Sequence, residues 1–185
     1  MFDKRRKKLK QMSRSQKKPS SMIAATRPNS RVAEQFRTIR TNIQFSMATK
    51  NLQTILFSSS GPFEGKSTIC TNIASVFADQ DKRVLVVDAD MRLPSIDKIF
   101  HLENKIGLST LMTSEKLKVE EAIQHVEGVH LDILPSGIVP PNPSELLASE
   151  RMDEIIEELK QQYDLVLFDL PPIVSVTDAQ IMAPK

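Results

Sequence analysis

The chain has 185 residues, 40% of them hydrophobic and 26% charged, which is enough to bury one sizeable core in a single globular domain. Its longest apolar runs, such as residues 84–87 and 165–168, are far shorter than the roughly 20 residues that cross a bilayer, and no signal-peptide pattern opens the chain. We therefore expect a cytoplasmic protein and exclude a collagen, a coiled coil and a membrane-spanning protein.

The net charge of +2 conceals a basic N-terminus. Residues 1–18 contain nine Lys or Arg and one Asp, which leaves 16 basic and 22 acidic residues in the rest of the chain. A charged run with few apolar residues cannot offset the entropy cost of ordering, so residues 1–29 are predicted to form a flexible tail. Two interpretations stay open, a solvated tail and one attracted to an anionic membrane surface. Nucleic acid is not an expected partner, because the tail lacks aromatics interleaved among its basic residues and the domain behind it is acidic.

An amphipathic helix is predicted to follow the tail. Ser30 can cap it, and Val32, Phe36, Ile39 and Ile43 recur at helical spacing.

Four β-type runs come next, at residues 54–58, 84–88, 129–134 and 165–169, separated by segments with helical patterning. This alternation predicts an α/β fold with a parallel sheet. Three runs are apolar almost throughout, as expected when helices cover both faces, whereas polar residues place 129–134 nearer an edge. A proline-rich loop then precedes Ser144, which we expect to cap a helix running to about Gln161, and a last short helix is expected to begin at Thr177.

The segment LFSSSGPFEGKST reads as a strand that enters a glycine-containing loop and then a helix. Such a loop binds a phosphate chain, because successive N–H groups and the helix N-terminus supply partial positive charge. The predicted nucleotide-binding residues are Gly61, Pro62, Phe63, Glu64, Gly65, Lys66, Ser67 and Thr68. Lys66 can reach the outer phosphates and Ser67 can place its hydroxyl on Mg²⁺. The motif is a variant, since Ser60 stands where the strict consensus has glycine.

Acidic residues end two of the predicted strands. Asp88 and Asp90 follow the run VLVV, and Asp169 ends the run LVLF. Because parallel strands share a carboxyl edge, these carboxylates should meet beside the phosphate loop, where a divalent cation can separate them from a triphosphate. Ser67, Asp90 and Asp169 are the predicted metal ligands, and ATP with Mg²⁺ is the expected ligand pair.

The phosphate loop, the element VVDADMRLP and the element FDLPP together resemble the cytoplasmic bacterial tyrosine kinases of capsule and exopolysaccharide synthesis, relatives of the MinD/ParA-type P-loop ATPases, over residues 22–185. The resemblance implies a P-loop NTPase-type parallel sheet with helices on both faces, autophosphorylation and transfer of phosphate to protein tyrosines. It assigns catalytic roles to Lys66, Asp88 and Asp90, with Asp88 as the candidate acceptor of the substrate proton.

The resemblance also implies partners. Glu34, Arg37 and Arg40 fit the E-x-x-R-x-x-R element through which such kinases assemble into homo-oligomeric rings, and helix geometry leaves Arg40 free to pair with another subunit. A separate transmembrane activator, similar to polysaccharide co-polymerases, is the expected partner. It would hold the kinase peripherally at the inner face of the cell membrane.

Two features depart from the family pattern. The family ends in a tyrosine cluster, whereas this sequence has one tyrosine, Tyr163, just before a strand. The last strands of the family fold are also missing, so residues 30–185 are expected to form a kinase domain incomplete at its C-terminus, with weak nucleotide binding. Two alternatives therefore stay open, a MinD/ParA-like ATPase and an inactive truncated scaffold. The first is disfavoured because Gly61–Glu64 lacks the additional lysine usual in that group.

Overall fold

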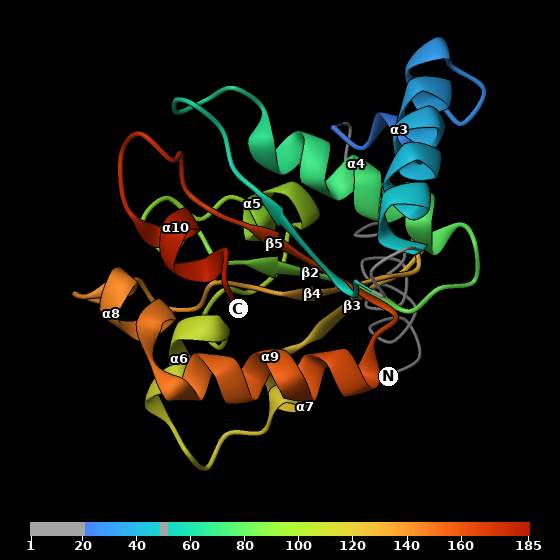
Figure 1. Ribbon diagram of the computed structural model, residues 1–185. Helices are drawn as coiled ribbons and strands as arrows, with labels where there is room; N and C mark the ends of the chain where they lie inside the picture. The colour runs from blue at the N-terminus through green and yellow to red at the C-terminus, as the bar shows by residue number, and fades with distance from the viewer. Residues whose placement is uncertain (1–20, 49–51) are drawn as a thin grey trace, which may run out of the picture.

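The computed structural model describes residues 21–48 and 52–185, so residues 1–20 of the predicted tail lie outside the described residues. An open sheet of five strands forms the centre of the molecule, with helices on both of its faces (Figure 1). Its strand order is β1-β5-β2-β4-β3. The strands are Thr54–Phe57 (β1), Val84–Asp88 (β2), Gln124–Val126 (β3), Leu131–Leu134 (β4) and Leu165–Asp169 (β5).

Helices on the two faces bury two separate apolar cores, as the alternating sequence pattern predicted (Figure 1). One core packs β2 and β5 against Ile23–Thr26 (α2), Arg31–Ala48 (α3), Lys66–Ala78 (α4) and Ile96–Phe100 (α5). The other lies beneath Leu108–Thr113 (α6), Val119–Ala122 (α7), Pro143–Ala148 (α8), Glu150–Gln162 (α9) and Asp178–Met182 (α10). None of the helices in the described ranges is long and apolar enough to span a membrane.

The sheet confirms the predicted α/β class but is mixed rather than wholly parallel. Strands β1, β5, β2 and β4 run parallel, and β3 pairs antiparallel with β4 at the edge. Sequence reasoning missed β3, because a strand of three residues with exposed His125 at its centre carries almost no periodic signal. The predicted run 129–134 is a strand only from Leu131 and lies next to that edge.

The helix predicted from Ser144 to about Gln161 is two helices. Helix α8 ends at Ala148, and Ser149 begins α9 as an N-cap whose side chain accepts from the Met152 N–H. The structure thus corrects the prediction at one residue, because a serine able to cap also fits within a continuous helical pattern. The Ser30 cap of α3 is confirmed, with Ser30 Oγ accepting from Ala33 N at 3.1 Å.

Folded structure begins before the expected tail boundary at residue 30. Met22 is completely buried, and α2 packs on α4 through the buried side chain of Asn72. Asn72 Oδ1 accepts from Ala24 N at 2.8 Å, while its Nδ2 donates to Ser21 O at 2.9 Å and to Thr68 O at 2.8 Å. One amide therefore ties the segment ahead of α3 to the first turns of α4.

Replacing Asn72 with alanine should lower the free energy of unfolding by about 1–3 kcal/mol, because the buried Ala24 N–H would lose its partner. Urea unfolding measures this change, and Asn42→Ala on the exposed side of α3 is the matched control. Equal midpoints for the two variants would contradict this role of Asn72.

Candidate functional site

The phosphate loop joins β1 to α4 and ends in a glycine that the backbone requires. Gly65 has φ +85°, in the left-handed region where a side chain would be strained, and α4 begins at the next residue. No side chain caps this helix, so its first N–H groups are available to a ligand. The loop thus presents the amide-lined helix N-terminus that binds phosphate.

A carboxylate of the chain itself already uses this loop as an anion site. Glu64 Oε2 accepts from the backbone N–H of Ser60 at 3.0 Å. Here the Glu64 oxygen stands in for a phosphate oxygen, since both are anionic acceptors of a backbone N–H. The contact indicates that the loop can hold negative charge.

Lys66 lies between two of the predicted aspartates. Its Nζ is 3.0 Å from Asp169 Oδ2 and 3.2 Å from Asp90 Oδ2, and its side chain is 10% exposed. Ser67 Oγ donates to Asp169 Oδ2 at 2.5 Å and accepts from Ser95 Oγ at 2.8 Å. The start of α4 and the ends of β2 and β5 therefore meet at one point, as the sequence predicted.

The register of the sheet places the acids there. Asp88 of β2 is paired directly with Asp169 of β5, and both side chains are fully buried. Asp88 accepts from the backbone N–H groups of Asp90, Ser95 and Ile96 at 3.2, 3.1 and 3.0 Å. It therefore shapes the loop that follows β2, whereas Asp90 reaches the cleft.

Two buried carboxylates, those of Asp90 and Asp169, contact Lys66, a third, that of Asp88, lies beside Asp169, and the pKa values of the group reflect this excess of negative charge. Burial, followed by repulsion from Asp169, raises the pKa of Asp88 to about 7. Burial also raises the pKa of Asp169, against the attraction of Lys66. Burial lowers the pKa of Lys66, but Asp169 and Asp90 outweigh it and the net shift is upward, which keeps the lysine charged.

The group offers oxygen ligands that fit a hard divalent cation. Asp169 Oδ1 is buried without a hydrogen-bond partner, next to the Ser67 hydroxyl that its other oxygen accepts from. Mg²⁺ uses few protein ligands and completes its shell with phosphate and water. Accordingly, no three His, Cys, Asp or Glu side chains within 21–48 and 52–185 form a metal cage by themselves. Ser67, Asp90 and Asp169 thus fit Mg²⁺ that arrives with a nucleotide.

A cleft of about 370 Å³ opens beside this group. It is lined by every predicted residue of the phosphate loop except Gly61, and by Asp90. Sequence reasoning missed its other wall, because nothing in the local pattern marks these residues as neighbours of the loop: Ser59, Leu93, Ser95, Ile99 and Pro172. Neither Asp88 nor Asp169 lines the cleft.

Arg92 anchors the loop that carries Asp90. Its Nε and Nη2 donate to Asp178 at 3.1 and 3.2 Å, and Nη2 also donates to Ser144 Oγ at 2.7 Å. Asp178 is fully buried at the start of α10, and Ser144 belongs to α8. Ser144, which the sequence suggested as a helix cap, instead joins α8 to α10 and to this loop.

The predicted oligomer residues Glu34, Arg37 and Arg40 lie on α3, do not line the cleft, and all make contacts within the chain. Arg37 pairs with Glu34 at 2.7 Å and also donates to Pro28 O, while Arg40 Nη1 donates to Val76 O of α4 at 2.8 Å. The expectation that Arg40 is free is therefore wrong, because its guanidinium reaches across to the neighbouring helix.

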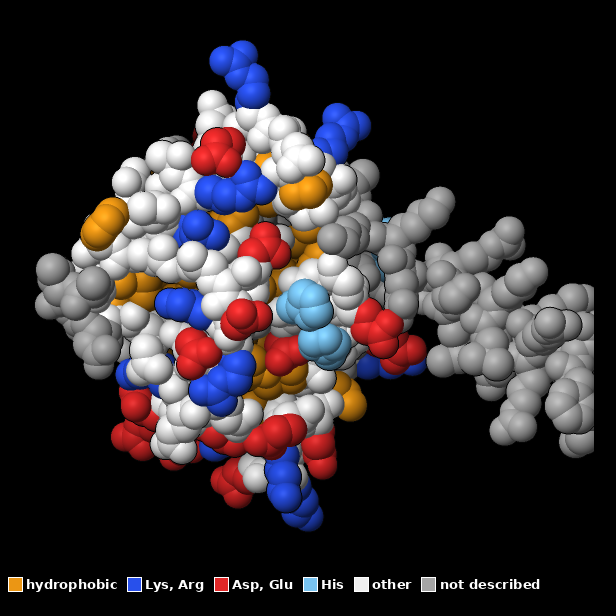
Figure 2. All heavy atoms as spheres, turned by 90° about the vertical axis from the view of Figure 1, so that its right-hand side faces the viewer, with side chains coloured by type: hydrophobic (Ala, Val, Ile, Leu, Met, Phe, Trp, Pro, Cys, Tyr) orange, Lys and Arg blue, Asp and Glu red, His pale blue; other side chains and the backbone are white. Residues whose placement is uncertain are grey.

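Tyr163 lies far from this cleft, at the other end of β5. Its hydroxyl donates to Asp132 Oδ2 at 2.8 Å, and Asp132 Oδ1 is 2.6 Å from His125 Nδ1. Figure 2 shows histidine side chains beside acidic ones on the face of the molecule where β3 lies. Tyr163 is 7% exposed, and burial together with Asp132 raises the pKa of its phenol well above the usual value.

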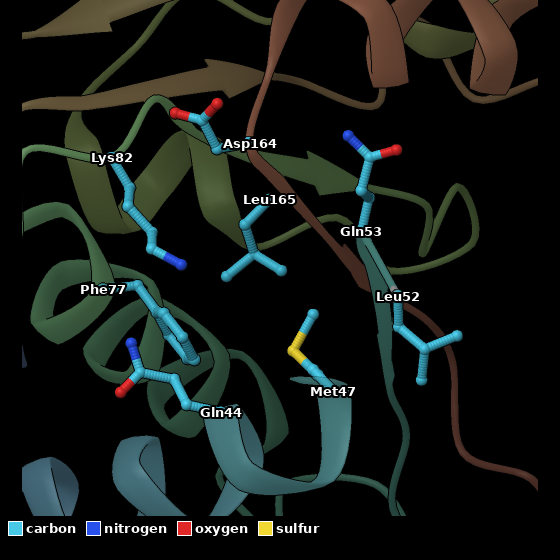
Figure 3. Close-up of a pocket in the computed structure, with 8 residues that line it drawn as sticks. All are labelled: Gln44, Met47, Leu52, Gln53, Phe77, Lys82, Asp164 and Leu165. Carbon is cyan, nitrogen blue, oxygen red and sulfur yellow. The ribbon is translucent and has the colours of Figure 1, made fainter. Parts of the chain in front are cut away.

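A second hollow, of about 450 Å³, lies at the amino end of the sheet (Figure 3). Apolar side chains of Met47, Phe77 and Leu165 point into it, and Lys82 Nζ lies 5.9 Å from the centre of the Phe77 ring. It has neither a glycine loop nor a long helix N-terminus, so it lacks the features of a phosphate site.

Comparison with known proteins identifies the family to which the chain belongs. The family model for the AAA domain matches residues 52–184. Tyrosine-protein kinase YwqD of Bacillus subtilis is 47% identical over 162 residues, covering 88% of this chain and 68% of that protein.

Solved structures show the same fold. The chimerical protein CapA2B2 has a TM-score of 0.85 at 40% identity, covering 89% of this chain and 72% of that one. The kinase domain of Escherichia coli tyrosine kinase ETK has a TM-score of 0.84 at 33% identity, covering 90% and 65%. MinD in the MinC:MinD complex of Aquifex aeolicus is more distant, with a TM-score of 0.58 at 27% identity over 72% and 52%. The chain therefore belongs to the bacterial tyrosine kinase family of P-loop proteins.

Proposed function

We propose that this chain transfers the γ-phosphate of ATP to protein tyrosines and so regulates capsule or exopolysaccharide synthesis. The observation that carries the proposal is the meeting of Lys66 with Asp90 and Asp169 beside an amide-lined helix N-terminus. Phosphoryl transfer needs this combination, since catalysis consists mainly of positioning and charge neutralisation around the phosphate.

The phosphate chain would lie along residues 61–68. The N–H groups at the start of α4 donate to phosphate oxygens, and Ser60 N becomes free for the same role once Glu64 turns away. Lys66 exchanges its aspartate partners for the outer phosphates, which carry more negative charge. Ser67 and Thr68 also line the cleft, where their hydroxyls can meet the phosphates and the metal.

Ser67, Asp90 and Asp169 would hold Mg²⁺, and the unpartnered Asp169 Oδ1 supports this choice. When bound, the ion would neutralise charge on the phosphates and on this carboxylate group. The position of Asp90 does not depend on the ion alone, because the hydrogen bonds of Asp88 and Arg92 fix the loop that carries Asp90.

The acceptor phenol must lose its proton while its oxygen bonds to the γ-phosphorus and the bond to ADP breaks. Its ordinary pKa is about 10, so a carboxylate in reach assists at neutral pH. Asp88 was the candidate from the sequence, but it is fully buried and holds three backbone N–H groups. We assign the proton to Asp90, which lines the cleft and whose Oδ2 is released when Lys66 moves to the phosphates.

Assembly and location follow from the family. We propose a homo-oligomeric ring that uses Glu34, Arg37 and Arg40 on α3; the side chains of Glu34 and Arg37 are 70% and 32% exposed. A transmembrane activator would recruit the ring to the inner face of the cell membrane.

A MinD/ParA-like ATPase is the second candidate, and the shared fold favours it. The kinase remains favoured over it, because the segment Gly61–Glu64 lacks the additional lysine that such dimeric ATPases use.

The experiment that separates the two candidates supplies ATP, Mg²⁺ and the activator's cytoplasmic segment, and measures phosphotyrosine and free phosphate together. Phosphate release without phosphotyrosine would support the ATPase.

Lys66→Met should reduce phosphotyrosine formation at least about 100-fold, because the cation that meets the outer phosphates is lost. Lys116→Met, at an exposed position outside the cleft, is the matched control. Normal turnover by the Lys66 variant would refute the site assignment.

Arg37→Ala combined with Arg40→Ala should lower the mass measured by light scattering, since the proposed ring contact is removed. Arg31→Ala on the same helix is the control and should leave the mass unchanged. Because Arg40 also holds α3 on α4, the melting temperature of each variant is measured alongside. An unchanged mass for the double variant would rule out this surface.

Tyr163→Phe should leave phosphotyrosine formation on added substrates unchanged, because the Tyr163 hydroxyl is buried and bonded to Asp132 far from the cleft. Peptide mass spectrometry of the wild-type chain after reaction should find residue 163 unmodified. Phosphate on Tyr163 would show that this end of β5 opens during turnover.

A further inference from the structure

Two hollows flank Lys66, and they differ in chemistry. The cleft of about 370 Å³ contains Asp90 and Ser95, whereas a hollow of about 510 Å³ on the β1 side contains Ser58 and Ser60 with Ile69 and Ile173. Both include Ser59, Glu64 and Lys66. The two hollows thus offer a nucleotide and an acceptor separate places beside this lysine.

The cleft with Asp90 has an apolar mouth. Phe63 on the phosphate loop is 99% exposed and Leu93 on the loop after β2 is 67% exposed, and both line this cleft. Ile99 and Pro172 add further apolar surface to its walls. Phosphates gain nothing from such side chains, so the wall serves another ligand.

Backbone geometry fixes the two mouth residues. Phe63 has φ +62°, an uncommon conformation for a bulky residue, and the strain is stored next to the site. Leu93 N donates to Asp90 Oδ1 at 3.1 Å, so the apolar side chain and the carboxylate belong to one short turn. A ligand with an apolar body and a hydroxyl at its tip could contact Leu93 with the body and Asp90 with the hydroxyl.

We propose that Phe63 and Leu93 receive the aromatic ring of the acceptor tyrosine and direct its hydroxyl to Asp90. This inference rests on the proposed kinase function and adds the acceptor site to it. Both side chains are exposed at the mouth of the cleft. An aromatic ring can pack on them while its hydroxyl points toward Asp90, whereas serine and threonine have no apolar ring to pack there, which gives the preference for tyrosine. The hollow on the β1 side is left for the sugar and base of the nucleotide.

The test uses the 185-residue chain with ATP, Mg²⁺ and a short polar peptide that contains a single tyrosine. Leu93→Ser should raise the KM for this peptide about tenfold, equivalent to about 1.4 kcal/mol, with nucleotide affinity changed less than twofold. Leu93→Phe should restore the wild-type KM, since it returns an apolar contact. Val174→Ser is the control, because Val174 is 75% exposed on a nearby loop but lines neither hollow. An unchanged KM, or an equal loss of nucleotide affinity, would overturn the proposal.

A binding measurement separates failure of this inference from failure of the kinase function. Fluorescence anisotropy in the presence of ADP and Mg²⁺ compares the tyrosine peptide with its alanine counterpart on wild-type and Leu93→Ser chains. Tighter binding of the tyrosine peptide by the wild type alone supports the acceptor site even where no transfer occurs. Equal binding of the two peptides by the wild type would overturn it.

Discussion

The site depends on the balance between one lysine and three buried carboxylates. Lys66 contacts Asp90 and Asp169 directly, while Asp88 lies beside Asp169 in the sheet. The negative charge exceeds what one ammonium can neutralise, and burial strengthens the repulsion among the acids. This surplus of negative charge favours binding of a divalent cation, and the buried Asp169 Oδ1, which has no hydrogen-bond partner, is a candidate ligand for it. A triphosphate without its cation would meet this surplus as repulsion, so nucleotide and metal should enter together.

Backbone pairing, rather than side-chain packing, brings these charges together. The register between β2 and β5 sets Asp88 against Asp169, and the Ala89 N–H donates to Asp169 O at 2.9 Å. Parallel strands expose their carboxyl ends on one edge, which is why α/β folds bind ligands there. Asp88 contributes to order, because its three accepted N–H bonds hold the loop in which Asp90 sits. Of the two acids in the segment Asp88–Asp90, Asp88 therefore orders the loop, and Asp90 lines the cleft proposed for the ligand.

The sequence predicted the central strands and the charged group because both have strong signals, namely uninterrupted apolar runs and a glycine loop before a helix. It could not predict the break at Ser149, since helical periodicity continues through a capping serine. The contact of Arg40 with Val76 was missed for another reason. An arginine on the polar side of a helix has enough reach to bridge to a neighbour, and only the packing of α3 on α4 shows that it does. The sequence did not single out Leu93 as a residue of the cleft, because its proposed role depends on its exposure at the cleft mouth, which a periodic pattern does not reveal.

The anchors of the loop after β2 differ in their dependence on the ligand. In the proposed nucleotide complex Asp90 loses its Lys66 partner to phosphate, but the bonds of Asp88 do not involve the ligand, and neither does the contact of Arg92 with Asp178. The loop can therefore keep its shape while one of its carboxylates changes partner. A site arranged in this way avoids most of the cost of reorganisation during transfer, because its dipoles are already oriented before the nucleotide arrives. The burial of Asp178 at the start of α10 then acquires a functional meaning, since its bond with Arg92 fixes, from outside the cleft, the turn that carries Asp90 and Leu93.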